Sequence, residues 1–255
     1  MVAICIPTYE NISLVKRLLD SIKLQIYTEY IVVISDDSLT NSIERLILSY
    51  KDLNIVYHRN EKPMGTSNNI NKALKIAFDL KVDYIKIMFQ DDWFAYDYSL
   101  QKFVQLISSS DFDVLFSANF EKYFDSEKIH IANPKRISKL KDNPRLIFSC
   151  NCLGAPSNLI YKTCDVMFDP DFTWLLDVDF YLRLLQGRKM EYFQEPLINI
   201  GHDGNQLTDF YMNNPSKMYD ETKRQFKKNK CFLSFENLVY FIKYSIKYYK
   251  NKLLH

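Results

Sequence analysis

The strongest chemical signal in the sequence is a pair of adjacent carboxylates, Asp91 and Asp92, at the end of an apolar run from Tyr84 to Phe89. The length and β-branched content of this run predict a buried strand, and open α/β sheets bind their ligands just beyond the carboxyl ends of strands. Carboxylates and substrate phosphates are usual ligands of Mg²⁺ and Mn²⁺. The pair therefore indicates a divalent cation site, although Asp-Asp alone is also typical of a turn or a helix cap.

Composition excludes several classes of protein. The 255 residues are enough for one α/β domain with a sizeable core, and the formal net charge of +2 argues against a protein that mainly binds nucleic acid. The five cysteines are odd in number and lack zinc-site spacing, which favours free thiols in a reducing cytosol. Because the sequence shows neither a signal peptide nor an apolar span of about 18 residues, we expect a cytoplasmic location.

The first ninety residues alternate between apolar runs and segments with helical periodicity. This alternation predicts a mostly parallel sheet with helices on both faces. Three polar clusters follow strands in the same direction and must meet at one edge of the sheet: Pro7–Asn11, Ser35–Ser38 and Gln90–Asp92. Their common location favours a binding site over three unrelated turns.

The alternation weakens after Asp92. We expect a helix over residues 99–108, a strand over 113–117 and a hairpin around 125–127. The basic segment 133–143 is expected to be a mobile surface segment, which either is simply solvated or covers a phosphorylated substrate.

Further candidates for chemistry lie in the second half of the chain. Asp177 and Asp179 open a stretch with helical spacing, and either one suits a helix N-terminus, where the dipole favours negative charge. His202 follows the last predicted strand, in a polar loop between two glycines. The sequence also has a distinct tail over residues 211–255, in which aromatic residues and lysines alternate on helical spacing. Such a helix is typical of a membrane interface, but it is equally compatible with packing on the domain or on a second subunit.

In this order and spacing, the motifs resemble those of the family 2 glycosyltransferases, from Val2 to about Thr208. The resemblance implies a single Rossmann-like nucleotide-diphospho-sugar transferase domain of type A, over residues 1–210, with a nucleotide-binding half (1–95) and an acceptor-binding half (96–210). The C-terminal helical tail, 211–255, lies outside it. The motifs that carry the resemblance are Pro7–Asn11, Asp36–Ser38, Asn60–Asn71, Gln90–Asp92, Asp177–Arg183 and His202.

The resemblance also implies roles for single residues. Asp92 and His202 would hold a Mn²⁺ or Mg²⁺ ion, Asp177 would be the general base, and one carboxylate of the pair Asp36 and Asp37 would accept from N3–H of uracil or thymine. The positions expected to bind the nucleotide sugar are Pro7, Thr8, Tyr9, Glu10, Asp36, Asp37, Asn68, Asp91 and Asp92.

Three positions depart from the common pattern of the family. Many relatives carry Arg-Asn where this chain has Asn68 and Asn69, so a basic contact to the nucleotide is missing or comes from elsewhere. Gln90 stands where the metal motif often has a first Asp. Leu176 replaces the acid often found before the base, which makes Asp177 a plainer choice of base than Asp179.

We therefore expect a metal-dependent, inverting glycosyltransferase of the hexosyltransferase type, with a UDP-sugar as donor. A cation neutralises the departing diphosphate, and a carboxylate takes the proton of the acceptor hydroxyl. The expected acceptor is a glycan of bacterial surface polysaccharide synthesis, carried on polyprenyl diphosphate at the inner face of the membrane. The alternatives are a nucleotidyltransferase, which normally has a Gly-rich basic loop after its first strand, and a non-catalytic nucleotide- or glycan-binding module.

Overall fold

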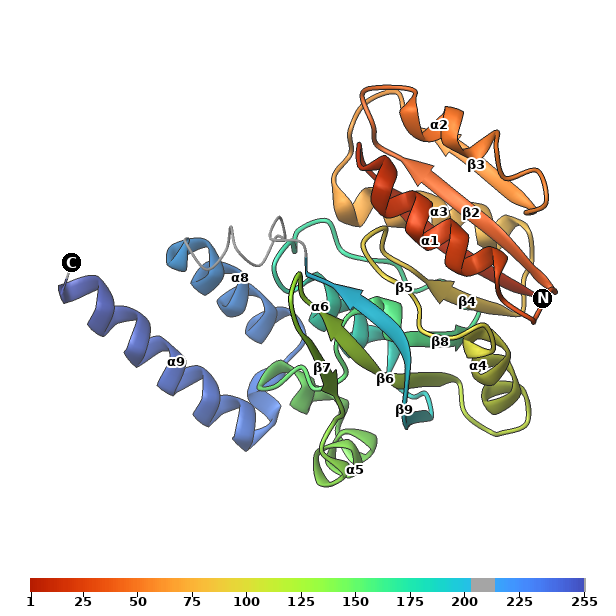
Figure 1. Cartoon of the computed structure of the whole chain (residues 1–255). Coiled ribbons are helices and arrows are strands. Elements are labelled where there is room, and N and C mark those ends of the chain that lie inside the picture. The colour runs from red at the N-terminus through yellow and green to blue at the C-terminus, as the bar shows by residue number, and fades with distance from the viewer. Residues whose placement is uncertain (203–213, 255) are drawn as a thin grey trace.

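The structure is a computed structural model that describes residues 1–202 and 214–254, with side chains as far as residue 250. Within these residues, nine strands form one curled sheet in the order β3-β2-β1-β4-β8-β6-β9-β5, with β7 paired to β6 (Figure 1). Helices cover both faces of this sheet. The arrangement confirms the α/β fold that the sequence predicts.

The N-terminal half is the regular strand-helix alternation expected from the sequence. Its strands β3, β2, β1 and β4 are parallel neighbours. Asn11 caps the first helix, because its side chain accepts from the backbone N–H of Leu14 at 3.2 Å. The elements are β1 (Val2–Thr8), α1 (Ile12–Lys23), β2 (Tyr30–Asp36), α2 (Ser42–Ile47), β3 (Ile55–Arg59), α3 (Thr66–Asp79) and β4 (Tyr84–Ile87).

The second half is of mixed direction. Strand β8 runs antiparallel to both β4 and β6, whereas β6 and β9 are parallel with a register shift near Ser117 and Ala118. The expected hairpin exists as β6 and β7. The elements are β5 (Trp93–Phe94), α4 (Ser99–Ser108), β6 (Val114–Lys122), β7 (Glu127–His130), β8 (Leu159–Lys162), α6 (Leu176–Leu184) and β9 (Met190–Gly201).

The basic segment after β7 differs from the expectation of a mobile surface segment. Residues Pro134–Asp142 form helix α5, and Asn133 caps it by accepting from the backbone N–H of Lys135 at 2.9 Å. Ile137 and Leu140 are buried against the domain. The two apolar residues, three positions apart, anchor one face of the helix, and the lysines lie on the solvent side.

The core divides into two clusters, one on each face of the sheet. Alternate residues of β1 point to opposite faces, so Ala3 and Cys5 join the cluster under α3 and α6, while Ile4 and Ile6 join the cluster under α1 and α4. Both faces of β1 are therefore buried, which explains its continuous apolar sequence.

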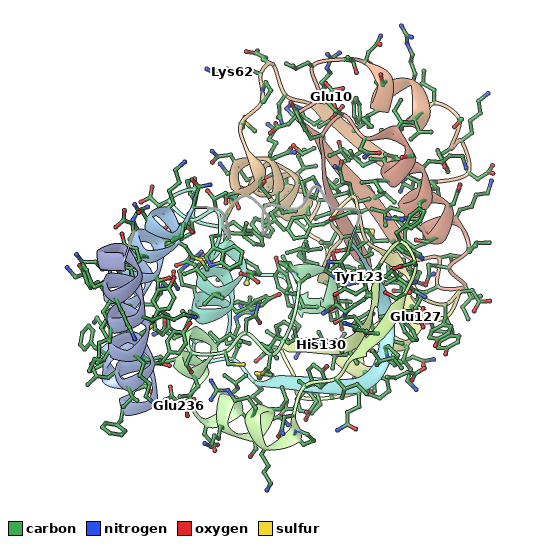
Figure 2. All side chains as sticks on the ribbon, turned by 60° about the vertical axis from the view of Figure 1, so that its left-hand side comes forward. Glu10, Lys62, Tyr123, Glu127, His130 and Glu236 are labelled. Carbon is green, nitrogen blue, oxygen red and sulfur yellow. The ribbon has the colours of Figure 1, made fainter. Side chains whose placement is uncertain are left out.

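The C-terminal segment forms α8 (Pro215–Lys228) and α9 (Phe235–Leu254), which lie on the side of α6 and β7 in Figure 1. Glu236, at the start of α9 and labelled in Figure 2, pairs with Arg136 of α5. Phe226 and Phe241 stack with ring centroids 4.2 Å apart and join the two helices. The expected domain boundary at 210/211 lies outside the described residues. No helix in the described part is long and apolar enough to cross a membrane.

Candidate active site

A cavity of about 1000 Å³ opens beyond the carboxyl ends of β1, β2 and β4. It combines residues from both halves of the chain, as the strand-end clusters predict. Neither Asp36 nor Asn68 belongs to its wall. The expected site residues that line it are Pro7, Thr8, Tyr9, Glu10, Asp37, Asp91, Asp92, Asp177 and His202.

Glu10 joins the loop after β1 to the loop after β2. Its backbone has a positive φ of 54°, which is uncommon for a residue with a side chain. The backbone N–H of Glu10 donates to the hydroxyl of Ser38 at 2.7 Å, and its carboxylate accepts from the backbone N–H groups of Leu39 (2.6 Å) and Thr40 (3.2 Å). These bonds hold the left-handed conformation in place. Glu10, which is labelled in Figure 2, thus lines the cavity, and its carboxylate already accepts hydrogen bonds from the protein.

Gln90 fastens the loop after β4 to the loop after β1. Its side-chain oxygen accepts from the backbone N–H of Tyr9 at 2.8 Å, and its side-chain NH₂ donates to the carbonyl of Tyr9 at 3.2 Å. An Asp at this position has no donor for the carbonyl. The departure of Gln90 from the common metal motif therefore coincides with a two-bond contact between two cavity loops.

Asp36 is a fully buried member of a hydrogen-bond network. Its carboxylate accepts from the hydroxyls of Thr8 (3.0 Å) and Tyr57 (2.7 Å) and from the backbone N–H of Ser38 (3.0 Å). These donors compensate for the burial of the carboxylate. The network positions Thr8, which does line the cavity.

Asp37 lies at the cavity and organises the turn before α3. It accepts from the side chain of Asn60 at 2.8 Å and from the backbone N–H groups of Met64 (2.9 Å) and Gly65 (3.0 Å). Gly65 has a φ of +80°, which a residue with a side chain rarely adopts. Asn68, one turn along, is exposed and donates to the carbonyl of Met64 at 3.1 Å, so the structure does not bring it into the cavity.

The two central acids have different environments. Asp92 is only 2% exposed, accepts from the backbone N–H of Gly201 at 3.2 Å and is hydrogen-bonded to the hydroxyl of Ser157. Burial raises the pKa of Asp92 well above its usual range, and the charge of Asp91 acts in the same direction. Asp91 is partly exposed. Asp91 is therefore the more accessible carboxylate of the pair.

The backbone of Asp91 is held from two sides. Its carbonyl accepts from the guanidinium of Arg17 at 2.6 Å, and this guanidinium lies 3.8 Å from the ring centroid of Trp93. A Cβ on Gly201 would lie 2.3 Å from the same carbonyl, so the close approach of these two loops requires glycine. Arg17 and Gly201 thus fix the acidic turn.

Lys86 is a buried lysine beneath this turn, and it is not among the expected site residues. It is fully buried in β4, and its ammonium group donates to the carbonyls of Ser157 and Leu159. Burial lowers the pKa of Lys86 well below its usual range, while the charge of Asp92 opposes that shift. A lysine in the middle of an apolar strand is the one sequence signal for it.

His202 lines the cavity from the end of β9. Its Nε2 contacts the carboxylate of Glu121, and the ring stacks on that of Tyr123 with centroids 4.4 Å apart. Glu121 also lines the cavity and is a site residue that sequence reasoning missed. Among the described residues, no three His, Cys, Asp or Glu side chains gather closely enough to hold a metal ion by themselves.

Asp177, in the first turn of α6, is a second acid of the cavity whose pKa is raised. Its carboxylate accepts from the side chain of Asn151 and from the backbone N–H of Val178, both at 2.7 Å. Burial nevertheless raises the pKa of Asp177 to about 6. Asp179 is not in the cavity wall: it is fully buried and paired with Arg183 (Nε at 2.8 Å) and Lys228 (3.0 Å). Asp177 thus lines the cavity, whereas Asp179 is buried in ion pairs away from it.

Comparison with known proteins supports the fold and identifies the family. Residues 3–155 match the family described as glycosyl transferase family 2. The fold is the type A fold of glycosyltransferases. The chain belongs to glycosyl transferase family 2.

Several solved structures share this fold. Staphylococcus aureus TarS (residues 1–349) in complex with UDP has a TM-score of 0.68 at 18% identity, over 89% of this chain and 64% of that chain. The mannosyltransferase PcManGT from Pyrobaculum calidifontis, in complex with GDP-Man and Mn²⁺, has a TM-score of 0.58 at 14% identity. The match covers 96% of this chain and 73% of that chain.

One curated relative is the uncharacterized protein MT1568 of Mycobacterium tuberculosis. It is 26% identical over 205 residues, which is 72% of this chain and 62% of that protein. The chain therefore spans less than two thirds of the length of both MT1568 and the TarS chain.

Proposed function

We propose that the protein is a metal-dependent, inverting glycosyltransferase that moves a sugar from a UDP-sugar to a hydroxyl of a glycan acceptor. One observation carries the proposal: the accessible carboxylate Asp91 and the elevated-pKa carboxylate Asp177 line the same cavity. Sugar transfer needs two separate acidic functions, one for the cation at the diphosphate and one for the acceptor proton. The cavity provides both from different elements.

The nucleotide side of the site would be the wall formed by Thr8, Tyr9 and Asp37. TarS structures contain UDP and UDP-GlcNAc, which supports uridine as the base. A thermal-shift screen with UDP, dTDP and GDP in Mn²⁺ tests this choice. We expect UDP to give the largest stabilisation, because ligands that bind the native state raise its melting temperature. A shift with GDP alone would contradict the base assignment.

A divalent cation, Mn²⁺ or Mg²⁺, fits the donor set at this edge. Such ions are often held by one or two protein ligands, with substrate phosphates supplying others, so a site without three clustered side chains is compatible with them. The family resemblance implies Asp92 as the metal ligand. Because the carboxylate of Asp92 is buried and hydrogen-bonded to Gly201 and Ser157, we propose Asp91 as the ligand instead, with His202 as the second ligand. When bound, the cation stabilises the diphosphate leaving group as a Lewis acid.

Asp177 would be the general base. The amide of Asn151 orients its carboxylate, and partial burial keeps the proton affinity of that carboxylate high. A base with a pKa slightly below the working pH is mostly deprotonated yet still accepts a proton efficiently. Deprotonation of the acceptor hydroxyl on the face of the sugar opposite the diphosphate gives inversion at the anomeric carbon.

The pH dependence of transfer follows from the pKa of Asp177 at about 6. Below this pH the carboxyl is protonated and cannot accept the acceptor proton. We expect the transfer rate to fall about tenfold for each pH unit below 6 and to level off above 7. A pH–rate profile of UDP release measures this fall in rate. A flat profile between pH 4.5 and 7 would contradict the assignment of Asp177 as the base.

The outer face of α9 is proposed to contact an anionic membrane surface. Most of its exposed apolar residues lie on one stripe, and exposed lysines at 243, 247 and 250 lie beside them. Aromatic and aliphatic residues beside lysines suit an interface with anionic head groups. This location supports a lipid-linked glycan acceptor of bacterial surface polysaccharide synthesis, on the inner face of the membrane. The stripe consists of Phe235, Leu238, Ile242, Ile246 and Tyr249.

A vesicle sedimentation assay tests this surface. We expect binding to phosphatidylglycerol vesicles and little binding to phosphatidylcholine vesicles, because each lysine near an anionic surface contributes about 1 kcal/mol. The double substitution Ile242→Asp and Ile246→Asp should abolish binding. If the wild-type protein ignores both vesicles and instead forms dimers that these substitutions dissolve, the stripe is a subunit interface.

A further inference from the structure

The loop that leads into the proposed base receives an unusual contact from the C-terminal segment. Glu221 of α8, only 7% exposed, accepts from three consecutive backbone N–H groups, those of Thr173, Trp174 and Leu175. The distances are 3.2, 2.8 and 3.1 Å. The N-cap residue of α6, Leu175, has no side-chain cap of its own. A carboxylate from a distant helix therefore binds the loop that leads into α6, as far as its N-cap residue.

The physical effect of this contact is twofold. The N–H groups of Thr173 and Trp174 lie in the loop before α6, and that of Leu175 belongs to the N-cap residue, so the carboxylate satisfies backbone donors of the loop and of the N-cap. The negative charge also lies at the positive end of the α6 dipole, where it is stabilising. Trp174 lines the cavity and Asp177 follows two positions after Leu175, so the carboxylate fixes the segment that carries both.

Further residues on the same side of α8 hold the neighbouring parts of this segment. Arg224 donates to the carbonyl of Asp171 at 2.6 Å, before the loop. Lys228 and Asn229 contact the buried carboxylate of Asp179 at 3.0 and 2.9 Å, after it. Positions 221, 224 and 228 follow helical spacing and share one face of α8. The segment around Asp177 is thus held on both flanks by one helix.

We propose that α8 is a structural part of the acceptor side of the active site and that Glu221 is a positioning residue for Asp177 and Trp174. The proposal rests on the proposed function in assigning Asp177 as base, but the contact itself does not. It places a residue outside the expected domain 1–210 in control of the catalytic geometry. A displacement of about 1 Å in a catalytic group costs up to about a hundredfold in rate.

The test compares Glu221→Gln with Asp220→Asn. Both substitutions remove one negative charge from α8, but Asp220 is exposed. Hydrogen exchange reports on the amides of residues 173–175, and UDP release from UDP-glucose, UDP-galactose and UDP-GlcNAc in Mn²⁺ reports on turnover. For Glu221→Gln we expect about tenfold faster exchange at these amides. We also expect a turnover number lowered at least about tenfold with donor KM within about twofold. Asp220→Asn should match wild type.

Unchanged exchange at residues 173–175, or unchanged turnover in a variant whose exchange has increased, would overturn the positioning role. Equal losses in donor binding and turnover, with a lower melting temperature, would also overturn it, because a purely structural role predicts them. If wild type releases no UDP from any of the three sugars, the proposed function fails. The exchange data alone then decide whether Glu221 holds the loop.

Discussion

Replacement of Asp177 by asparagine is expected to lower sugar transfer by about 10²- to 10⁴-fold, while the affinity for UDP and Mn²⁺ stays within about twofold of wild type. Asparagine has nearly the same shape, and its amide oxygen can still accept from Asn151 or Val178. It cannot take the proton of the acceptor hydroxyl. The loss should therefore fall on the chemical step, which UDP release measures, and spare donor binding, which calorimetry measures.

The stability of this variant separates a catalytic loss from an unfolding one. Because folding raises the pKa of Asp177 to about 6, ionisation of this carboxyl at pH 7.5 disfavours the folded state, and a neutral amide removes that cost. Asp177→Asn should therefore melt no lower than wild type at pH 7.5. Asp179→Asn is the contrasting variant, since it leaves Arg183 and Lys228 without their shared carboxylate and should lower the melting temperature. Wild-type transfer activity in Asp177→Asn would show that Asp177 is not the general base.

Replacement of Asp91 by asparagine is expected to lower transfer by about 10³-fold and to remove the effect of Mn²⁺ on UDP binding. Loss of a cation at a departing diphosphate costs several kcal/mol in the transition state, which corresponds to a rate change of this size. Affinity for UDP measured with and without Mn²⁺ isolates the metal-dependent part. The variant should bind UDP equally in both buffers.

Asp92→Asn is the matched control for this substitution. Its amide oxygen can accept from the backbone N–H of Gly201, and its NH₂ can donate to Ser157, so the buried site keeps its hydrogen bonds. We expect UDP binding to keep its dependence on Mn²⁺. The opposite pattern, with that dependence lost in Asp92→Asn and kept in Asp91→Asn, would return the metal role to Asp92, as the sequence alone indicated.

Much of the fold is predictable from the sequence because its first half is built from buried parallel strands. Such strands are apolar on both faces, so Val2–Thr8 and Tyr30–Asp36 are visible as uninterrupted runs that end in polar residues. The direction of these strands then dictates that the polar ends meet. The cavity bounded by Thr8, Asp37 and Asp91 is a direct consequence.

Other features depend on the direction in which a side chain points, which the residue type alone does not determine. Asn68 and Asn69 are adjacent in α3, where one position is a rotation of about 100°, and it is Asn69 that is buried and donates to the carbonyl of Thr8 at 3.0 Å. The same applies to Asp91 and Asp92, whose identical side chains lie in different environments. Neither difference has a signature in the local sequence.

Long-range contacts were the other limit on prediction. Glu221 lies 46 residues beyond Leu175 in sequence, in a tail whose pattern predicts a helix without naming the residues that it contacts. The segment that became α5 looked equally polar, yet Ile137 and Leu140 bury one side of it. Tertiary contacts of this kind decide the structure after the regular alternation ends.

The most direct test of the account is the product formed from a panel of nucleotide sugars. The protein is incubated with UDP-, dTDP- and GDP-sugars, with and without Mn²⁺, and the released nucleotides are identified. We predict that at least one UDP-sugar yields UDP, that Mn²⁺ stimulates the release, and that Asp177→Asn abolishes it. Release of no nucleoside diphosphate from any donor, or formation of a nucleotide sugar and pyrophosphate from UTP and a sugar phosphate, would contradict the proposal.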